Sequence, residues 1–168
     1  MIFFGLILVG GAAYYLLSQH ISERRAKAEE YTATLRLLKH IRGALSSGGG
    51  RLCDILHGFA SKPLSDNRLL HVLCTDEVRG AEGSGAVFFR DSLQDISFLI
   101  DAADAKRLVA YFEDFGKGYI EEEKRRLSEI TEYFSLREKE FIEKSEKDIK
   151  AARIIFAFAF VGAFILLL

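Results

Sequence analysis

The chain has 168 residues, of which 23 are lysine or arginine and 24 are aspartate or glutamate, giving a formal net charge of -1. This length suits one modest domain, and the near balance of charges excludes nucleic-acid binding driven by a strongly basic composition. One proline, no tryptophan and few β-branched runs favour helix over strand, so the sequence predicts an all-α fold.

The first predicted element is a membrane-spanning helix over residues 1–21, a segment without any Asp, Glu, Lys or Arg. At about 1.5 Å per residue, a helix of this length crosses a hydrocarbon layer of roughly 30 Å. Tyr14 and Tyr15 lie near one end of the run, as interfacial aromatic side chains often do. The alternative is a cleaved signal peptide, but the segment has no basic start and no clear small-x-small cleavage site.

Residues 22–150 are predicted to form a cytoplasmic helical bundle. From Ile21 to Leu45, apolar residues recur at steps of three, four and seven, which predicts one amphipathic helix continuing from the membrane. The serines and glycines of residues 46–50 are expected to end it. A short second helix follows over residues 52–59 and should stop before Pro63, because the residue before proline avoids the α region.

Two more short helices are expected in the middle of the chain. Ser65 or Asp66 is the predicted N-cap of a third helix, which carries the apolar residues of segment 69–73. A fourth helix is predicted over residues 87–99, after a glycine-rich turn, although its first three residues also suit a strand.

The longest helical stretch covers residues 104–150, with Asp101 or Asp104 as its predicted N-cap. Gly116 and Gly118 leave open whether this stretch is one helix or two. The apolar residues at helical spacing, which we expect to face inward, are Leu108, Phe112, Phe115, Tyr119, Leu127, Ile130, Phe134, Phe141 and Ile149.

A second membrane-spanning helix is predicted over residues 151–168. The uncharged part, Ile154–Leu168, gives only about 22 Å of helix, so Lys150 and Arg153 must reach back to the headgroups. A buried soluble helix is the alternative, but nothing polar follows to cover its phenylalanines.

Basic residues flank both apolar runs on the side of the middle segment, so the positive-inside rule predicts that residues 22–153 are cytoplasmic. Inside the two spans, small residues allow close helix packing, and the candidates for it are Gly10, Gly11, Ala159, Gly162 and Ala163.

Chemical motifs are scarce, and the sequence predicts a protein that is not an enzyme and has no cofactor. The glycine-rich segments 47–51 and 80–85 lack the Gly-Lys-Ser/Thr of a phosphate loop. One weak metal-ligand set exists, because two sulfurs and two imidazoles suit zinc, and it consists of Cys53, His57, His71 and Cys74. Such short spacings arise readily on apolar helices, and cysteine is often a small buried hydrophobe, so no metal site is predicted.

Two motifs, in this order between the apolar ends, carry a resemblance to the stage III sporulation protein AB family. They are Leu52-x-Asp54-Ile55-x3-Phe59-Ala60 and Phe112-x2-Phe115-Gly116, which resemble the family's leucine-acidic-aliphatic segment and its phenylalanine-glycine turn. The likeness covers the full length, including a second span that ends in leucines. Arg51 and Ile120 depart from the family's usual proline and glycine, which affects the turns at those positions.

The resemblance implies a role in endospore formation, within a secretion-like complex in the mother-cell membrane around the forespore. It implies a non-enzymatic platform subunit that docks the cytoplasmic ATPase stage III sporulation protein AA and contacts other membrane subunits. Docking needs exposed apolar side chains, and the candidates are Phe88, Phe89 and Tyr133.

The alternative function is an independent membrane-anchored coiled-coil scaffold or signalling protein. It would use the two long helical stretches to dimerise. Polar residues interrupt their heptad pattern, which favours a compact bundle within one chain, and these residues are Arg42, Glu123, Arg137 and Ser145.

Overall fold

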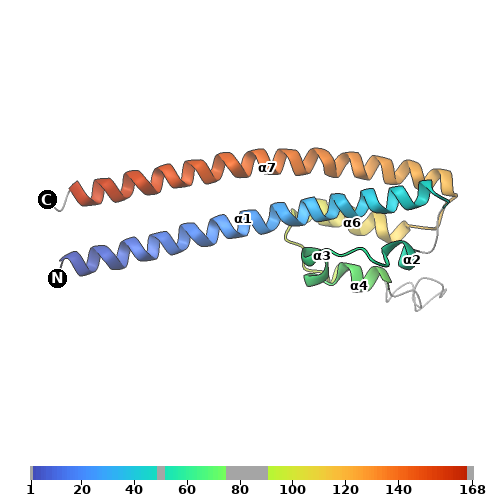
Figure 1. Ribbon diagram of the computed structural model, residues 1–168, viewed down its shortest axis with the longest axis horizontal. Coiled ribbons are helices and arrows are strands. Elements are labelled where there is room, and N and C mark those ends of the chain that lie inside the picture. The colour runs from blue at the N-terminus through green and yellow to red at the C-terminus, as the bar shows by residue number, and fades with distance from the viewer. Residues whose placement is uncertain (1, 49–51, 75–90, 166–168) are drawn as a thin grey trace. The chain divides into compact units, whose positions relative to one another are not determined.

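The computed structural model describes the backbone of residues 2–48, 52–74 and 91–165, and the side chains of residues 10–48, 52–74 and 91–162. Every regular element in these ranges is a helix (Figure 1), so the predicted all-α fold is confirmed.

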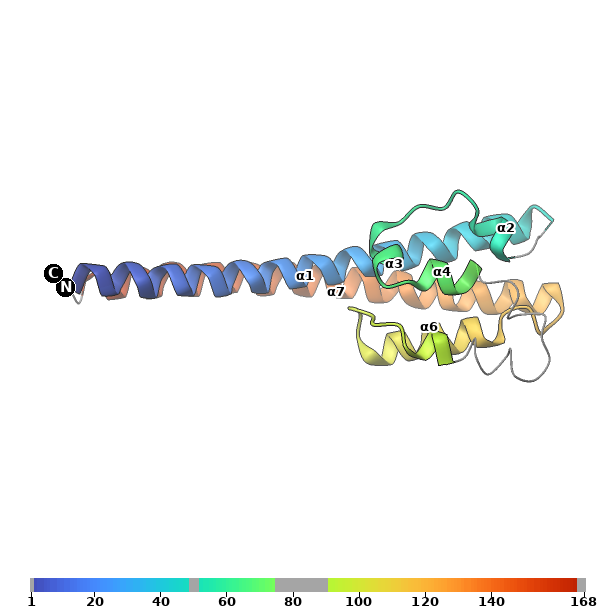
Figure 2. The same ribbon diagram turned by 90° about the horizontal axis from the view of Figure 1, so that it is seen from below.

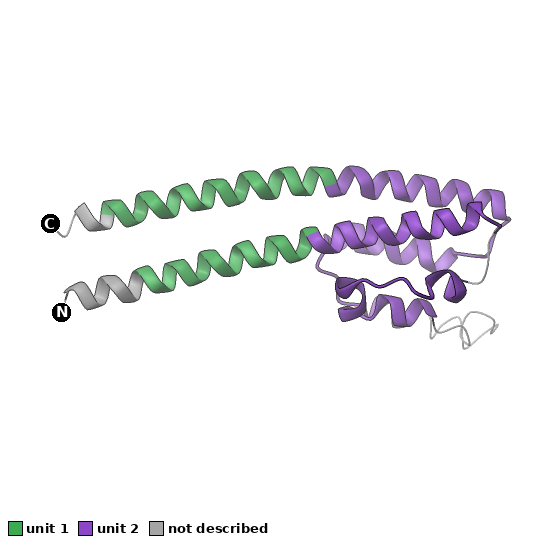
Figure 3. Cartoon of the chain, viewed as in Figure 1, with its two compact units in different colours: residues 1–28, 139–168 green, residues 29–138 purple. Residues whose placement is uncertain are grey.

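Two compact units make up the chain (Figure 3). Unit 1 consists of residues 1–28 and 139–168, and unit 2 of residues 29–138. Helices α1 (Ile2–Ser46) and α7 (Ile120–Ile165) each contribute one part to both units.

Unit 1 is an antiparallel pair formed by the first part of α1 and the last part of α7. Its contacts follow antiparallel register, since each step toward the N-terminus on α1 is matched by one toward the C-terminus on α7. The contacts are Lys27 with the ring of Phe141 at 5.3 Å, Arg24 with Asp148 at 3.3 Å, and Tyr14 with Phe156 at 6.4 Å between ring centroids.

The two predicted membrane spans lie in unit 1. Among the residues whose side chains are described, the structure contains no helix long and apolar enough to cross a membrane. The side chains of residues 1–9 and 163–168, which belong to the predicted spans, lie outside that description.

The small residues proposed for packing between the two spans differ in what surrounds them. A Cβ atom at Gly10 would lie 3.5 Å from the ring of Phe160, whereas one at Gly11 or Gly162 would meet nothing within 4 Å. Ala159 is exposed, and the side chain of Ala163 lies outside the described residues.

In unit 2, α1, α6 (Ala102–Asp114) and α7 pack against one another, and the short helices cover the face of α1 and α6 that is turned away from α7 (Figures 1 and 2). The short helices are α2 (Leu52–Leu56), α3 (Lys62–Asp66) and α4 (Leu69–Cys74). Helix α4 packs on both α2 and α3.

The core of unit 2 draws large side chains from all of these helices, because each helix buries one apolar stripe. Helix α2 contributes Leu52, Ile55 and Leu56. The largest fully buried side chains are Tyr31, Leu37, Leu38, Ile41, Leu64, Leu69, Leu73, Leu93, Leu108, Phe112, Leu127 and Phe134. The expected inward stripe of α1 is thereby confirmed from Tyr31 to Leu45, whereas Ile21 and Ala28 are only half-buried. Most of the stripe expected for residues 108–134 is also confirmed.

The predicted end of the first helix at residues 46–50 is confirmed, whereas the second helix was expected to reach residue 59 and ends at Leu56. Segment 69–73 is helical, as predicted for the third helix, but the predicted N-cap of that helix was wrong. Pro63 lies in the first turn of α3, where its missing N–H costs no helical hydrogen bond. The next helix is the separate α4, and Asn67 Oδ1 accepts a hydrogen bond from the Leu69 amide at 3.0 Å. Neither Ser65 nor Asp66 is therefore the N-cap, because both belong to α3.

The prediction of a helix over residues 87–99 was wrong in its second half. Helical backbone is present at residues 91–94 and stops there, and residues 96–98 have no regular structure. The amides of Leu99 and Ile100 donate instead to the Glu30 carboxylate, which replaces the hydrogen bonds that a continuing helix would supply. Residues 87–90 lie outside the described residues.

The stretch from residue 104 to 150 is two helices, α6 and α7, separated by residues 115–119. Gly116 makes the turn with φ of 81°, and its amide donates to Glu123 Oε2 at 3.2 Å. The break ends the helical register, so Tyr119 is 87% exposed and the expectation that it faces inward was wrong.

Two glycine-to-alanine substitutions should have opposite effects. Gly116→Ala forces a left-handed conformation on an L-residue and should lower the free energy of unfolding by about 1 kcal/mol. Gly43→Ala is in the interior of α1 with open space around its Cβ position, so it should raise that energy by roughly 0.5–1 kcal/mol. Urea unfolding of the full chain in detergent, followed by circular dichroism, measures both; equal signs would contradict the assigned turn.

Candidate functional site

The residues of the weak metal-ligand set do not form a metal site in the structure. Cys53 and Cys74 are half-buried, and His57 and His71 are exposed. Among the described residues, no group of three or more His, Cys, Asp or Glu side chains is arranged to hold a metal ion.

Of the three docking candidates, only Tyr133 can be placed, because Phe88 and Phe89 lie outside the described residues. Tyr133 is half-buried, its hydroxyl donates to Asp104 Oδ1, and its ring lies 4.0 Å beneath the guanidinium of Arg107. These contacts make it part of a polar cluster rather than of an exposed apolar surface.

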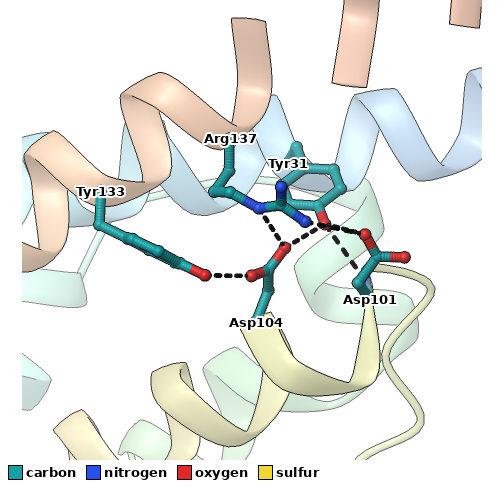
Figure 4. Close-up of polar contacts among 5 residues, drawn as sticks. All are labelled: Tyr31, Asp101, Asp104, Tyr133 and Arg137. Carbon is teal, nitrogen blue, oxygen red and sulfur yellow. Dashed lines mark hydrogen bonds and ion pairs between the residues drawn. The ribbon is translucent and has the colours of Figure 1, made fainter. Parts of the chain in front are cut away.

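The polar cluster is formed in unit 2 by side chains from α1, from the start of α6 and from α7 (Figure 4). Its members are Tyr31, Asp101, Asp104, Tyr133 and Arg137. It joins segments far apart in the sequence at one point, beside the apolar core.

The centre of the polar cluster is the carboxylate of Asp104, whose residue is 1% exposed. Arg137 Nε donates to its Oδ2 at 3.1 Å, and the hydroxyls of Tyr31 and Tyr133 donate to Oδ2 and Oδ1. A carboxylate taken out of water is tolerated only where a cation and hydrogen-bond donors replace the lost solvation. Three donors, from α1 and α7, do so here.

The second carboxylate, Asp101, lies at the edge of the polar cluster. Arg137 Nη2 donates to its Oδ2 at 3.1 Å, and its own amide donates to the Tyr31 hydroxyl oxygen at 3.2 Å. Asp101 occupies the N-cap position of α6, as predicted, but its side chain makes no capping hydrogen bond, so the predicted capping role was wrong. Its carboxylate bonds to Arg137 instead.

Both phenols of the polar cluster are held in the neutral form. Burial raises the pKa of Tyr31, and its hydrogen bond to Asp104 raises it further. The hydrogen bond to Asp104 is the main cause of the raised pKa of Tyr133, and burial adds to it. A phenolate would face the carboxylate at close range, so each hydroxyl keeps its proton and serves as a donor.

Glu30, next to Tyr31 in α1, makes a second buried polar site and is 1% exposed. Its Oε2 accepts hydrogen bonds from the amides of Leu99 and Ile100, the latter at 3.1 Å. Its Oε1 accepts from Asn67 Nδ2 at 2.6 Å. Glu30 thereby positions the non-helical segment before α6 and the link between α3 and α4.

The geometry of the polar cluster suits a structural latch. Each hydroxyl donates to a carboxylate, and the arginine spans Asp101 and Asp104, so the polar groups satisfy one another. A satisfied buried network fixes the helices that contribute to it in one arrangement.

This latch was not predicted from the sequence, although the sequence carries one indication of it, namely polar residues within an apolar series. Arg137 and Glu123 interrupt an apolar series, and both are engaged with carboxylate or backbone partners: Arg137 in the polar cluster, and Glu123 at the Gly116 amide. Polar residues at inward positions are therefore the pattern that could have indicated it.

Comparison with known proteins returned no match to this chain among protein-family models, curated proteins or solved structures.

Removing the charge at the centre of the polar cluster should be strongly destabilising. Asp104→Asn leaves Arg137 and two hydroxyl donors around a neutral amide, which should lower the free energy of unfolding by about 2–4 kcal/mol. Asp114→Asn, the matched control on α6, removes only surface ion pairs and should cost about 0–1 kcal/mol. Similar losses for both variants in chemical unfolding would contradict a buried latch.

The phenols predict how stability depends on pH. Because the folded-state pKa of Tyr31 is raised, its contribution is fully present below the unfolded pKa of about 10 and is lost as pH rises further. Wild-type stability should therefore fall above about pH 10, and Tyr31→Phe should make this fall shallower while costing about 1–2 kcal/mol at pH 7. Unfolding curves between neutral and alkaline pH measure both; an unchanged alkaline slope in Tyr31→Phe would refute the assignment.

Proposed function

We propose that the chain is a non-enzymatic, membrane-anchored platform subunit of a secretion-like complex that acts in endospore formation. The observation that carries this proposal is the continuity of α1 and α7, each a single helix from an apolar end of the chain to the polar cluster. The resemblance to the stage III sporulation protein AB family agrees with it, and implies an anchor in the mother-cell membrane with unit 2 in the cytoplasm.

This continuity suits a subunit that links a cytoplasmic motor to membrane components. Tyr31 belongs to the helix with the first apolar run, and Arg137 to the helix with the second. Both meet on Asp104, so a partner that moves the bundle also acts on the two helices that carry the apolar runs. A platform needs this mechanical link and no chemistry of its own.

The scaffold alternative requires the long helices to pair with another chain. In unit 1 the two helices pair with each other, through contacts such as Arg24 with Asp148 and Tyr14 with Phe156. Pairing within one chain supports the platform over a dimerising coiled coil.

Exposed apolar side chains at the start of α7 are the best candidates for docking the ATPase, which by resemblance is stage III sporulation protein AA. Tyr119 is 87% exposed and Ile120 is 48% exposed, at the opposite end of α7 from the apolar run. Aromatic side chains of this kind are frequent anchors of protein interfaces. We therefore propose Tyr119 and Ile120 as the docking site, in place of Tyr133.

The test is a binding titration of the ATPase against the full chain in lipid nanodiscs, with the ATPase rate measured in parallel. Saturable binding is expected, and Tyr119→Ser should weaken it at least about tenfold. Leu99→Ser is the matched control, because Leu99 is also an exposed apolar residue (54%) but lies before the N-terminus of α6, whereas Tyr119 follows its C-terminus. This control should change the affinity by less than about threefold.

Two outcomes would overturn parts of this proposal. No saturable binding by a chain with wild-type helicity would refute the docking function. Release of the chain from membranes by alkaline carbonate would refute the anchor, since integral membrane proteins stay in the pellet.

A further inference from the structure

Unit 1 contains an open cavity of about 560 Å³ between the first part of α1 and the last part of α7, and both arginines in its lining, Arg25 and Arg153, are exposed to solvent. This volume falls in the range of small-molecule sites in proteins. Its polar lining comes from both helices and consists of Ser18, Ser22 and Arg25 of α1 and Arg153 of α7.

The two arginines are distinguished from their neighbours by having no carboxylate partner. Arg24 pairs with Asp148 at 3.3 Å. Within the described part of the chain, Arg25 and Arg153 make no ion pair or hydrogen bond, and no acidic residue lines the cavity. Two guanidinium groups that line one open cavity without a counterion offer positive charge to an anion, and their planar donors suit a phosphate.

The rest of the lining is apolar and aromatic. Leu17 and Phe156 contribute to it, and the ring of Tyr14 lies against that of Phe156 at 6.4 Å. A free inorganic anion would make no favourable contacts with these apolar side chains. A ligand that joins a phosphate to a hydrocarbon chain would contact both halves of the lining.

The position of the cavity along the chain agrees with such a ligand. Arg25 follows the first uncharged run, and Arg153 directly precedes the second, so the cavity lies where both helices change from charged to apolar. Tyr14 lies on the apolar side of Arg25, as interfacial aromatic residues do.

We propose that this cavity binds an anionic phospholipid, with its phosphate on Arg25 and Arg153 and the start of its acyl chain along Leu17 and Phe156. The inference rests on the membrane anchoring proposed above. Ser18 and Ser22 supply further hydroxyl donors near the headgroup. A zwitterionic lipid would bring a choline that finds no acidic partner in the lining, so the site selects for net negative charge.

The test uses the purified full chain in a non-ionic detergent and isothermal titration with dihexanoyl phosphatidylglycerol below its micelle concentration. Dihexanoyl phosphatidylcholine and inorganic phosphate are titrated in parallel, to separate the anionic lipid from a zwitterionic lipid and from free phosphate. Phosphatidylglycerol should bind at least about tenfold more tightly than either.

Variants then assign the binding to the cavity. The double variant Arg25→Gln, Arg153→Gln should weaken phosphatidylglycerol binding about 30-fold, because it removes two positive charges that would each attract the lipid phosphate. The charge-matched control is Lys144→Gln with Lys147→Gln, because both lysines are exposed on α7 and neither lines the cavity; it should change the affinity less than about threefold. Arg25→Lys with Arg153→Lys keeps the charge but loses the planar donors, so an intermediate loss is expected.

Three results would overturn the proposal: equal binding of the two lipids, inorganic phosphate binding as tightly as phosphatidylglycerol, or equal losses in the arginine and lysine variants. Far-ultraviolet circular dichroism shows whether each variant keeps its helices, and the Arg→Lys pair serves as the test if the Arg→Gln pair does not fold. The titration needs neither the ATPase nor a bilayer. A negative titration would therefore refute lipid binding without bearing on ATPase docking, and the carbonate test addresses the membrane anchor independently.

Discussion

The arrangement of unit 2 depends on the buried carboxylate of Asp104. Charge on a residue that is 1% exposed would be very costly without partners, and Arg137, Tyr31 and Tyr133 supply them. Because these partners come from α1 and α7, the three helices meet in the one register that brings all donors onto the carboxylate. The apolar core around the polar cluster provides burial energy but far less directional information.

Two consecutive residues of α1 extend this constraint to the rest of unit 2. Tyr31 reaches the start of α6, while Glu30 holds the amides before α6 and the Asn67 side chain between α3 and α4. The segment before α6 is therefore fixed by a side chain from another helix rather than by its own hydrogen bonds. At the other end of α6, Glu123 does the same for the Gly116 turn.

The same two long helices link the features on which the functional proposals rest. In unit 1 they line the open cavity with Arg25 and Arg153, and in unit 2 they supply the donors of the polar cluster. The exposed pair Tyr119 and Ile120 lies at the start of one of them. The lipid site and the docking pair that we propose thus lie on, or directly before, the same two helices that form the latch.

Local pattern in the sequence determined the all-α class, the end of α1, the start of α2 and most inward-facing residues, since apolar periodicity reports which face of a helix is buried. The sequence also showed that Arg137 and Glu123 interrupt an apolar helical pattern, but it did not indicate which residues they contact. Only the tertiary structure decided that the helix before α6 stops after Gln94, that Pro63 lies in the first turn of α3, and that Asp104 is a latch rather than a cap. Each of these outcomes depends on groups brought together by folding, which no local propensity or spacing can encode.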